Sequence, residues 1–368
     1  MVSDTNDYRS GKEDIDSTPG SIPSISLKAY DELHGRLSKL AEKLNLSNEN
    51  EDRFISSLLK RNCSRKVFAI PSGTEFLKDK IKLLPEQIIE NKNSRAKPKL
   101  VKLCKIPWVD DKYIKEENDI TSDQLSINSY PLDLSSVFMG SPLLYIRDII
   151  GKEKDSPTNS LDACASPGGK SVLLYCYLKP LFHIANEKNP KRIKALVSNF
   201  SRLNLKNACV TNNDARSIFH KMDGSFSLIL LDAPCSGQAL IGKGLANSSS
   251  LTPIAANSAA SIQRSLLHKS ANSVSPGGYL LYMTCTFSRE ENEKVIHSFL
   301  NTQKDFSAVE VPMLKEHQSH LADFSCYRLW PYEGLGAGGF TCLLQKNGLL
   351  KENSIKTPIP AKICWSSL

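Results

Sequence analysis

Hydrophobic residues recur at two different spacings along the chain, and the spacing changes near residue 159. Between Leu27 and Leu59, apolar residues recur at the spacing of amphipathic helices, among them Leu33, Leu37, Leu40 and Leu44 and later Phe54, Leu58 and Leu59. A second helical pattern runs from Phe76 to Ile89. Residues 1–25 are polar and rich in Ser, Asp, Gly and Pro, which is typical of a tail without a packed core. We therefore predict a small α-rich N-terminal domain over residues 26–130, preceded by a tail.

Beyond residue 159, short apolar runs alternate with helical patterns. The runs that predict strands are Ser160–Cys164, Leu181–Asn186, Ala208–Thr211, Phe226–Leu231, Tyr279–Met283 and Gly339–Gln345. The helical stripes between them are Val172–Leu178, Ile193–Leu203, the segment around Leu266 and Val295–Phe299. This alternation predicts an α/β fold with a doubly wound, Rossmann-like sheet over residues 131–348. Residues 349–368 are expected to form a C-terminal tail.

Two shorter signals refine this picture. Pro276-Gly277-Gly278 predicts a turn before the strand at Tyr279. Ser288 and Glu291 stand three residues apart, which is the spacing of a capping box, so we expect them to begin the following helix.

Composition excludes several classes of protein. The chain has 368 residues, 40% hydrophobic and 23% charged, and no run of about 18 apolar residues, so we expect no membrane span. The acidic N-terminus has no apolar stretch, and neither a signal peptide nor a transit peptide is expected. Ten cysteines without a Cys-x-x-Cys pair predict neither a zinc site nor disulfides. A reducing compartment, the cytoplasm, is the expected location.

The net charge of +8 is compatible with a polyanionic partner, but it describes a merely basic surface equally well. The segment 91–115 holds eight Lys and Arg residues. One interpretation is a solvated loop or helix face. The other is an arm that contacts phosphates beside Trp108 and Tyr113.

The stretch "LDACASPGGKS" (161–171) ends in Gly169-Lys170-Ser171, as a loop that binds nucleotide triphosphates does. Such a loop requires a glycine five residues before this ending, where the chain has Cys164. The dinucleotide fingerprint Gly-x-Gly-x-x-Gly is also absent. A P-loop ATPase is therefore disfavoured, although ATP binding without binding of another donor would revive it.

Residues with functional chemistry follow successive predicted strands, at the ends where parallel sheets bind ligands. In chain order they are Asp162 to Gly169, Glu187, Asp214, Asp232 and Cys285. The acids suit a ligand rich in hydroxyls and amines and free of phosphate, and Glu187 is placed for a ribose diol. S-adenosylmethionine has this character. The alternative is that each acid is an ordinary cap or loop residue.

Two cysteines indicate the chemistry of a methyl acceptor. "DAPCSG" (232–237) and "MTCTFSREENE" (283–293) place Cys235 and Cys285 at the ends of neighbouring strands, where both could face one cavity. A lone cysteine is usually a small buried hydrophobe. Two cysteines in polar loops are less easily explained in that way.

These motifs resemble those of the Sun-type (Nol/Nop/Sun) RNA cytosine-5 methyltransferase family. "CASPGGK" is similar to its donor loop, "DAPCSG" to its fourth motif, "TCTFSREENE" to its sixth and "RLWPYEGLGAGGF" (328–340) to its last. The similarity covers about residues 130–346. It implies a class I methyltransferase fold that transfers a methyl group from S-adenosylmethionine to carbon 5 of a cytosine in rRNA or tRNA.

The resemblance also assigns roles to residues. It implies that Cys285 is the nucleophile that adds to carbon 6, that Cys235 assists loss of the carbon-5 proton and release of the enzyme, and that Asp232 hydrogen-bonds the base. Because the base must leave its stack, the expected target is a cytosine in a single strand or loop. The implied donor contacts are Cys164, Ala165, Ser166, Pro167, Gly168, Gly169, Lys170, Glu187, Asp214 and Asp232. Arg192 is a weaker candidate that could equally well be a solvated helix residue.

Two departures from the family pattern bear on RNA recognition. Ile241-Gly242-Lys243-Gly244 replaces the arginines that often follow the fourth motif, and Gly338 replaces the usual acid of the last one. The stretch Gly242–Ala260 is interpreted either as a surface lid that orders with RNA or as a disordered insertion. Two other functions stay open: a catalytically inactive methyltransferase-fold protein that binds RNA, and a methyltransferase acting on proteins or small molecules.

Overall fold

The computed structural model describes residues 26–61, 63–71, 103–116, 129–150, 158–349 and 363–367. Three predicted segments lie outside the described residues: the tail at 1–25, the helix at Phe76–Ile89 and residues 91–102 of the basic segment.

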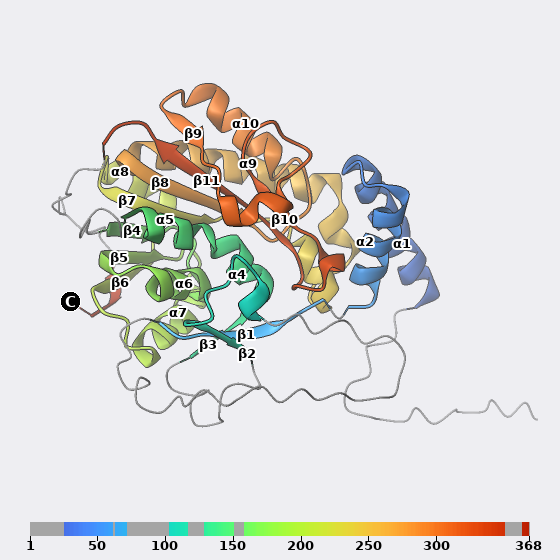
Figure 1. The fold of residues 1–368 in the computed structure, drawn as a ribbon, viewed down its shortest axis with the longest axis horizontal. Helices are drawn as coiled ribbons and strands as arrows, with labels where there is room; N and C mark the ends of the chain where they lie inside the picture. Colours follow the sequence, from blue (N-terminus) through green and yellow to red (C-terminus); the bar gives the residue numbers. More distant parts are fainter. Residues whose placement is uncertain are drawn as a thin grey trace, which may run out of the picture.

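The N-terminal part combines two helices with a small sheet (Figure 1). Helices α1 (Leu27–Lys43) and α2 (Asn48–Leu59) begin at serine caps, Ser26 and Ser47, whose hydroxyls accept backbone N–H groups. Strands β1 (Lys66–Ala69), β2 (Ile114–Glu116) and β3 (Tyr130–Asp133) form an antiparallel sheet in the order β2-β1-β3. The predicted domain boundary near residue 130 therefore falls inside β3.

The larger sheet has nine strands. They are β4 (Thr158–Asp162), β5 (Pro180–Asn186), β6 (Ala208–Thr211), β7 (Phe226–Asp232), β8 (Val274–Thr284), β9 (Phe306–Ala308), β10 (Tyr327–Leu329), β11 (Gly339–Lys346) and β12 (Ile363–Ser366). Their order is β10-β11-β8-β7-β4-β5-β6-β12, with β9 beside β11. The five central strands, which lie in the order β8-β7-β4-β5-β6, are parallel to one another. The outer strands β9, β10, β11 and β12 pair antiparallel with their neighbours. The predicted doubly wound α/β sheet is confirmed.

Helices cover both faces of this sheet (Figure 1). They are α4 (Leu134–Gly140), α5 (Pro142–Ile150), α6 (Gly169–Tyr177), α7 (Pro190–Arg202), α8 (Ala215–Lys221), α9 (Pro253–Ser270) and α10 (Glu293–Thr302). Side chains of α4 to α7 pack in one apolar core and those of α8 to α10 in a second. Along β7, Leu228 and Leu230 face the first core while Ile229 and Leu231 face the second, because side chains alternate along a strand.

The chain order reverses between β4 and β7, which lie side by side at the centre of the sheet. At such a switch point the loops beyond the carboxyl ends of the strands diverge and leave a crevice. The loop 163–168 and the loop after Asp232 leave the sheet at this point. The fold therefore places the two motifs around one opening.

Three local expectations are wrong. Glu291 does not cap a helix, because α10 begins at Glu293 and its N-cap residue, Asn292, makes no side-chain cap bond. Pro276–Gly278 is not a turn between elements; it lies inside β8, where the register against β7 shifts. Residues 242–260 are not a disordered insertion: they contain a short 3-10 helix, Ser248–Leu251, and the first half of α9.

The Ser/Ala-rich sequence folds because alanine has the highest helix propensity and Thr252 caps α9 by accepting the Ala255 N–H. Ala256 and Ala260 are buried on one face of that helix. The segment assigned to a C-terminal tail also contains structure. Strand β12 pairs antiparallel with β6 and extends the sheet at that edge.

A buried polar network lies behind the start of α6. The Ser171 hydroxyl donates to Asp162 (2.7 Å), His183 Nε2 lies 3.0 Å from the same hydroxyl, and Ser160 Oγ lies 2.9 Å from His183 Nδ1. All four side chains are fully buried. Burial raises the pKa of Asp162 to about 7 and lowers the pKa of His183 to about 3, because it disfavours both charged forms.

These two pKa shifts act on stability in opposite directions. Between pH 3.8 and about 7 the folded state holds a proton on Asp162 that the unfolded chain releases, so this contribution is lost as pH rises. Between about pH 3 and 6.5 the unfolded chain binds a proton on His183 that the folded state refuses, so that contribution is lost as pH falls. The two slopes oppose each other between about pH 4 and 6.5.

We predict that Asp162→Asn makes the protein lose stability on acidification from pH 6.5 to 4.5, by up to about 1.4 kcal/mol per pH unit, because only the His183 slope remains. His183→Gln should do the reverse and gain stability on acidification. Urea denaturation at several pH values measures both. Parallel pH profiles for the two variants would contradict the assignment.

Candidate active site

The two cysteines of the sequence motifs meet at the carboxyl ends of β7 and β8. Cys235 follows β7 by three residues and Cys285 follows β8 by one. Their Sγ atoms lie 3.1 Å apart, and both side chains are partly buried. Backbone bonds tie the loops together, because Ala233 N donates to Met283 O (3.0 Å) and Ala239 N to Cys285 O (3.1 Å). The sequence predicted that both cysteines could face one cavity; the structure brings their sulfurs into contact, but of the two only Cys285 is among the residues that line the cavity described below.

The environment gives the two thiols different acidities. The pKa of Cys285 is lowered, first by the hydrogen bond between its sulfur and that of Cys235, and further because Lys170 and Lys243 are near. The pKa of Cys235 is raised well above its ordinary value by the same hydrogen bond, by burial and by nearby negative charge. These opposite shifts favour Cys285 as the thiolate of the pair and Cys235 as the proton donor.

The donor loop turns sharply between β4 and α6. Gly168 has φ +115°, a left-handed conformation that favours glycine. A Cβ on Gly169 would lie 2.8 Å from a methyl carbon of Leu132, so a side chain at this position would require the Leu132 side chain to shift. The next residue, Lys170, is buried, and its Nζ lies 3.1 Å from Asp232 Oδ2. This ion pair joins the loop after β4 to the motif after β7.

A cavity of about 280 Å³ lies between these elements. Of the residues proposed from the sequence, those that line it are Ala165, Ser166, Pro167, Gly169, Lys170, Asp232 and Cys285. Residues of β3 and of the last motif complete the wall, among them Tyr130, Leu132 and Ala337. The donor loop, the fourth motif and the sixth motif therefore share one cavity.

Other proposed residues lie outside this lining, namely Cys164, Gly168, Glu187, Asp214 and Cys235. Cys164 is held among Asp162, Asp232 and Glu187, and burial with these charges raises the pKa of its thiol. Cys235 stands behind Cys285 at the contact described above.

Glu187 and Asp214 already have protein partners. Glu187 Oε1 accepts the Asn189 N–H (2.7 Å), and Oε2 pairs with Arg192 (3.1 Å). Asp214 caps α8 and pairs with Arg216 and Lys188, and the hydrogen bonds from Arg216 hold the pKa of its carboxyl below the usual range.

Arg192 is more than a solvated helix residue. Its guanidinium pairs with Glu187 and also donates to the Ser166 carbonyl of the donor loop. It thus links the loop after β4 to the residue that follows β5, and a contact with the methyl donor stays a prediction.

Sequence reasoning missed a second ion pair in the cavity wall. Asp133 and Lys243 both line the cavity, with Lys243 Nζ 3.2 Å from Asp133 Oδ2. Asp133 also accepts the hydroxyls of Ser64 and Ser135, and the charge of Lys243, together with these bonds, lowers its pKa against the effect of burial. Lys243 appeared in the sequence only as a departure from the family pattern. Asp133 carried no signal, because β3 brings it to the site from the N-terminal sheet.

The structure accounts for the glycine at 338. Gly338 has φ +94°, and a Cβ there would lie 2.7 Å from the Phe287 ring and 2.9 Å from the Leu329 carbonyl. No acidic side chain fits at this position without rearrangement. Trp108 is also not an RNA-stacking residue: it is 1% exposed, packs edge-on against Phe138 and lies 3.2 Å from His317 Nε2 through its indole nitrogen.

Within the described residues, no group of three or more His, Cys, Asp or Glu side chains is arranged to hold a metal ion. No helix in the described part of the chain has the length and apolar character needed to cross a bilayer.

Strand order, parallel centre and the crevice at the switch point define an α/β protein of the class I methyltransferase type. Two solved structures support this fold. A methyltransferase homolog from Pyrococcus horikoshii matches with a TM-score of 0.58 at 20% identity, covering 84% of this chain and 98% of that one. NSun6 from Pyrococcus horikoshii, solved with SFG, matches with a TM-score of 0.57 at 20% identity, covering 86% and 97%.

The family follows from the sequence comparisons. The profile described as "16S rRNA methyltransferase RsmB/F" matches residues 151–345, more than half of the chain, and the protein belongs to this family. Ribosomal RNA small subunit methyltransferase F of Serratia proteamaculans is 31% identical over 209 residues, covering 56% of this chain and 43% of the relative. The Escherichia fergusonii protein is 33% identical over 197 residues, covering 52% and 40%. The chain thus spans about two fifths of the length of these curated relatives, and the predicted resemblance is confirmed.

Proposed function

We propose that the protein is an RNA cytosine-5 methyltransferase that uses S-adenosylmethionine and acts on a cytosine of ribosomal RNA. The contact between the Cys235 and Cys285 sulfurs, beside a cavity lined by the donor loop, is the observation that carries this proposal. The names of the curated relatives favour ribosomal RNA as the substrate. Transfer RNA stays the second possibility.

In this mechanism the Cys285 thiolate adds to carbon 6 of cytosine. The new S–C bond moves the electron pair of the C5–C6 double bond onto carbon 5, which becomes nucleophilic enough to be methylated. Transfer of the methyl group would leave the donor as a neutral thioether. Cys235 gives its own proton to the base when Cys285 adds, and the resulting Cys235 thiolate then removes the carbon-5 proton, which restores the double bond and expels Cys285 as a thiolate. The Cys235 sulfur lies 3.1 Å from that of Cys285, so it is placed to donate its proton to the base, to become a thiolate and to accept the carbon-5 proton afterwards.

The residues of the site fit S-adenosylmethionine, whose sulfonium supplies an electrophilic methyl group when it is bound. The cavity wall offers the carboxylate of Asp232 and a glycine turn that leaves the backbone open. Glu187 lies outside the cavity lining, but each of its carboxylate oxygens keeps a lone pair beside the one taken by Asn189 or Arg192, and we expect these to accept ribose hydroxyls. The missing glycine at Cys164 disfavours a triphosphate in the same loop.

Two alternatives predict different results. An inactive RNA-binding protein with this fold would bind RNA without forming an adduct, and it has no use for a thiol whose pKa is lowered by its neighbour. A methyltransferase for proteins or small molecules does not require the second cysteine. Incorporation of labelled methyl groups into RNA separates all three.

We predict that Cys235→Ala accumulates a covalent RNA adduct in the presence of RNA and S-adenosylmethionine, because methylation proceeds while release is blocked. Cys285→Ala should form no adduct, since the nucleophile is gone. Denaturing gels report both outcomes. Cys364→Ala, which changes an exposed cysteine, is the control. An adduct in Cys285→Ala but not in Cys235→Ala would mean that Cys235 is the nucleophile. RNA methylation by both variants would contradict a mechanism that uses the two cysteines.

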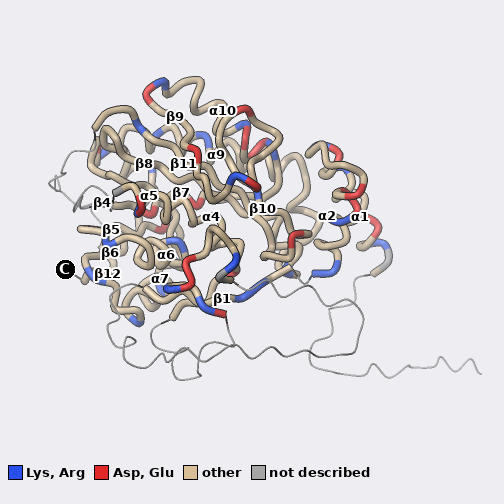
Figure 2. The backbone as a smooth tube through the Cα atoms, viewed as in Figure 1, with Lys and Arg blue, Asp and Glu red and all other residues tan. Residues whose placement is uncertain are grey.

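Basic residues of the described chain lie beside the cavity. The segment Lys60–Lys66 follows α2. Within it, Ser64 donates to Asp133 of the cavity wall, and Cys63 N donates to Gly242 O (3.1 Å), next to the lining residue Lys243. Lys60 and Lys66 are exposed, and Figure 2 shows basic residues around α2 and β1. We infer that this segment contacts phosphates next to the target base. Segment 91–115 stays a second candidate; within it, Lys105 and Lys112 are exposed.

We predict that Lys60→Glu with Lys66→Glu weakens RNA binding at low salt and reduces the slope of log affinity against log salt by about 1 to 2, as expected for two lost phosphate contacts. The matched control is Lys221→Glu with Lys304→Glu, which changes two exposed lysines at the end of α8 and before β9. Equal losses in both variants would indicate only an effect of net charge. A loss confined to Lys97→Glu, Lys99→Glu and Lys102→Glu would assign the contact to the other segment.

A further inference from the structure

Glu291 joins the loops of the two cysteines. Its side chain is fully buried. Oε2 accepts the Ser236 N–H (2.8 Å) and the Gln263 amide (3.0 Å), while Oε1 accepts the hydroxyls of Ser236 (2.5 Å) and Thr286 (3.2 Å). Ser236 directly follows Cys235, and Thr286 directly follows Cys285. One carboxylate therefore holds both neighbours of the sulfur pair.

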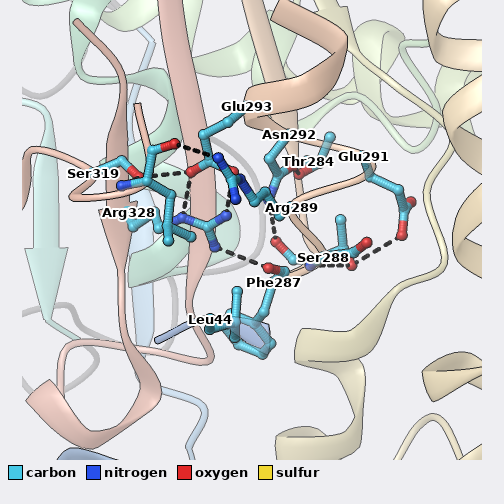
Figure 3. A network of polar contacts seen from close by, with 12 residues as sticks. Leu44, Thr284, Phe287, Ser288, Arg289, Glu291, Asn292, Glu293, Ser319 and Arg328 are labelled. Carbon is cyan, nitrogen blue, oxygen red and sulfur yellow. Dashed lines mark hydrogen bonds and ion pairs between the residues drawn. The ribbon is translucent and has the colours of Figure 1, made fainter. Parts of the chain in front are cut away.

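The two residues after Glu291 perform separate tasks (Figure 3). Asn292 stays within the Cys285 loop: its Oδ1 accepts the Thr284 hydroxyl (2.6 Å) and its Nδ2 donates to Thr286 O (2.9 Å). Glu293 turns to the other side and forms a buried pair with Arg328 (2.5 Å). Of these three residues, Glu291 is the one that is hydrogen-bonded to the Cys235 loop.

We propose that Glu291 is a positioning residue that holds Cys235 against Cys285 and keeps Cys235 protonated, so that Cys285 is the attacking thiolate. The catalytic purpose of this positioning rests on the proposed methyltransferase function, whereas the hydrogen bonds of Glu291 are independent of it. A buried carboxylate that accepts four hydrogen bonds is costly to disturb, because each lost partner leaves a buried donor unpaired.

The electrostatics act in the same direction. The negative charge of Glu291 is among the causes that raise the pKa of Cys235. The charged groups that act on Cys285 are Asp232, Lys170 and Lys243. The hydrogen bonds of Glu291 to Ser236 hold the residue next to Cys235, so we expect Glu291 to act on Cys285 through Cys235.

The test measures the alkylation rate of Cys285 by iodoacetamide across pH, with peptide mapping to separate it from the other cysteines. Glu291→Gln is nearly isosteric but replaces one acceptor with a donor. We expect its Cys285 rate at pH 7 to fall about five- to tenfold, because a weaker bond from Cys235 leaves less thiolate. Glu290→Gln, which changes an exposed neighbour paired with Lys294, should leave the rate unchanged.

A double-mutant cycle tests the route of the effect. In a Cys235→Ala background, Glu291→Gln should change the Cys285 rate less than twofold, since its intermediary is gone. An undiminished fall in that background, or no fall with Cys235 present, would overturn the proposal. If Glu291→Gln does not fold, Ser236→Ala removes one partner and should give a smaller fall. No RNA is used, so failure of this test is distinct from failure of the methyltransferase proposal.

Discussion

The contact between two sulfur atoms is the interaction on which the site depends. Neighbouring strands of a sheet lie about 4.8 Å apart. Side chains just beyond two strand ends therefore stay within hydrogen-bond distance only if hydrogen bonds fix the conformation of both loops. In this protein β7 and β8 are parallel neighbours, and Cys235 and Cys285 lie 3.1 Å apart beyond them. That hydrogen bond also makes the two thiols chemically unequal, since one donates and the other accepts.

Two ion pairs surround the sulfur atoms of Cys235 and Cys285. Lys170 with Asp232 and Lys243 with Asp133 place two cations near Cys285 without an uncompensated buried charge. The N-terminal helices are part of the same construction, because Phe54 of α2 packs on Phe287, two residues after Cys285, with ring centroids 5.0 Å apart. The N-terminal part and the sheet thus share one functional region.

Much of this arrangement could be predicted from the sequence, because apolar periodicity and strand-end motifs are local signals. Strand β6 (Ala208–Thr211) was predicted with its observed bounds, and the donor loop and both cysteines were assigned to one edge of the sheet. Long-range contacts carried no such signal. Asp133 reaches the cavity only through the pairing of β3 with β1, and Glu291 matched a helix cap by spacing while the fold uses it to join two loops.

The central claim is that Cys285, and not Cys235, attacks the base. RNA that contains 5-fluorocytidine tests it most directly in the unaltered protein, because fluorine cannot leave carbon 5 as the proton does and the covalent adduct persists. After digestion, mass spectrometry identifies the cysteine that carries the nucleotide. The account predicts a methylated fluorocytidine on the peptide of Cys285. The same nucleotide on Cys235, or no adduct while ordinary RNA is methylated, would contradict it.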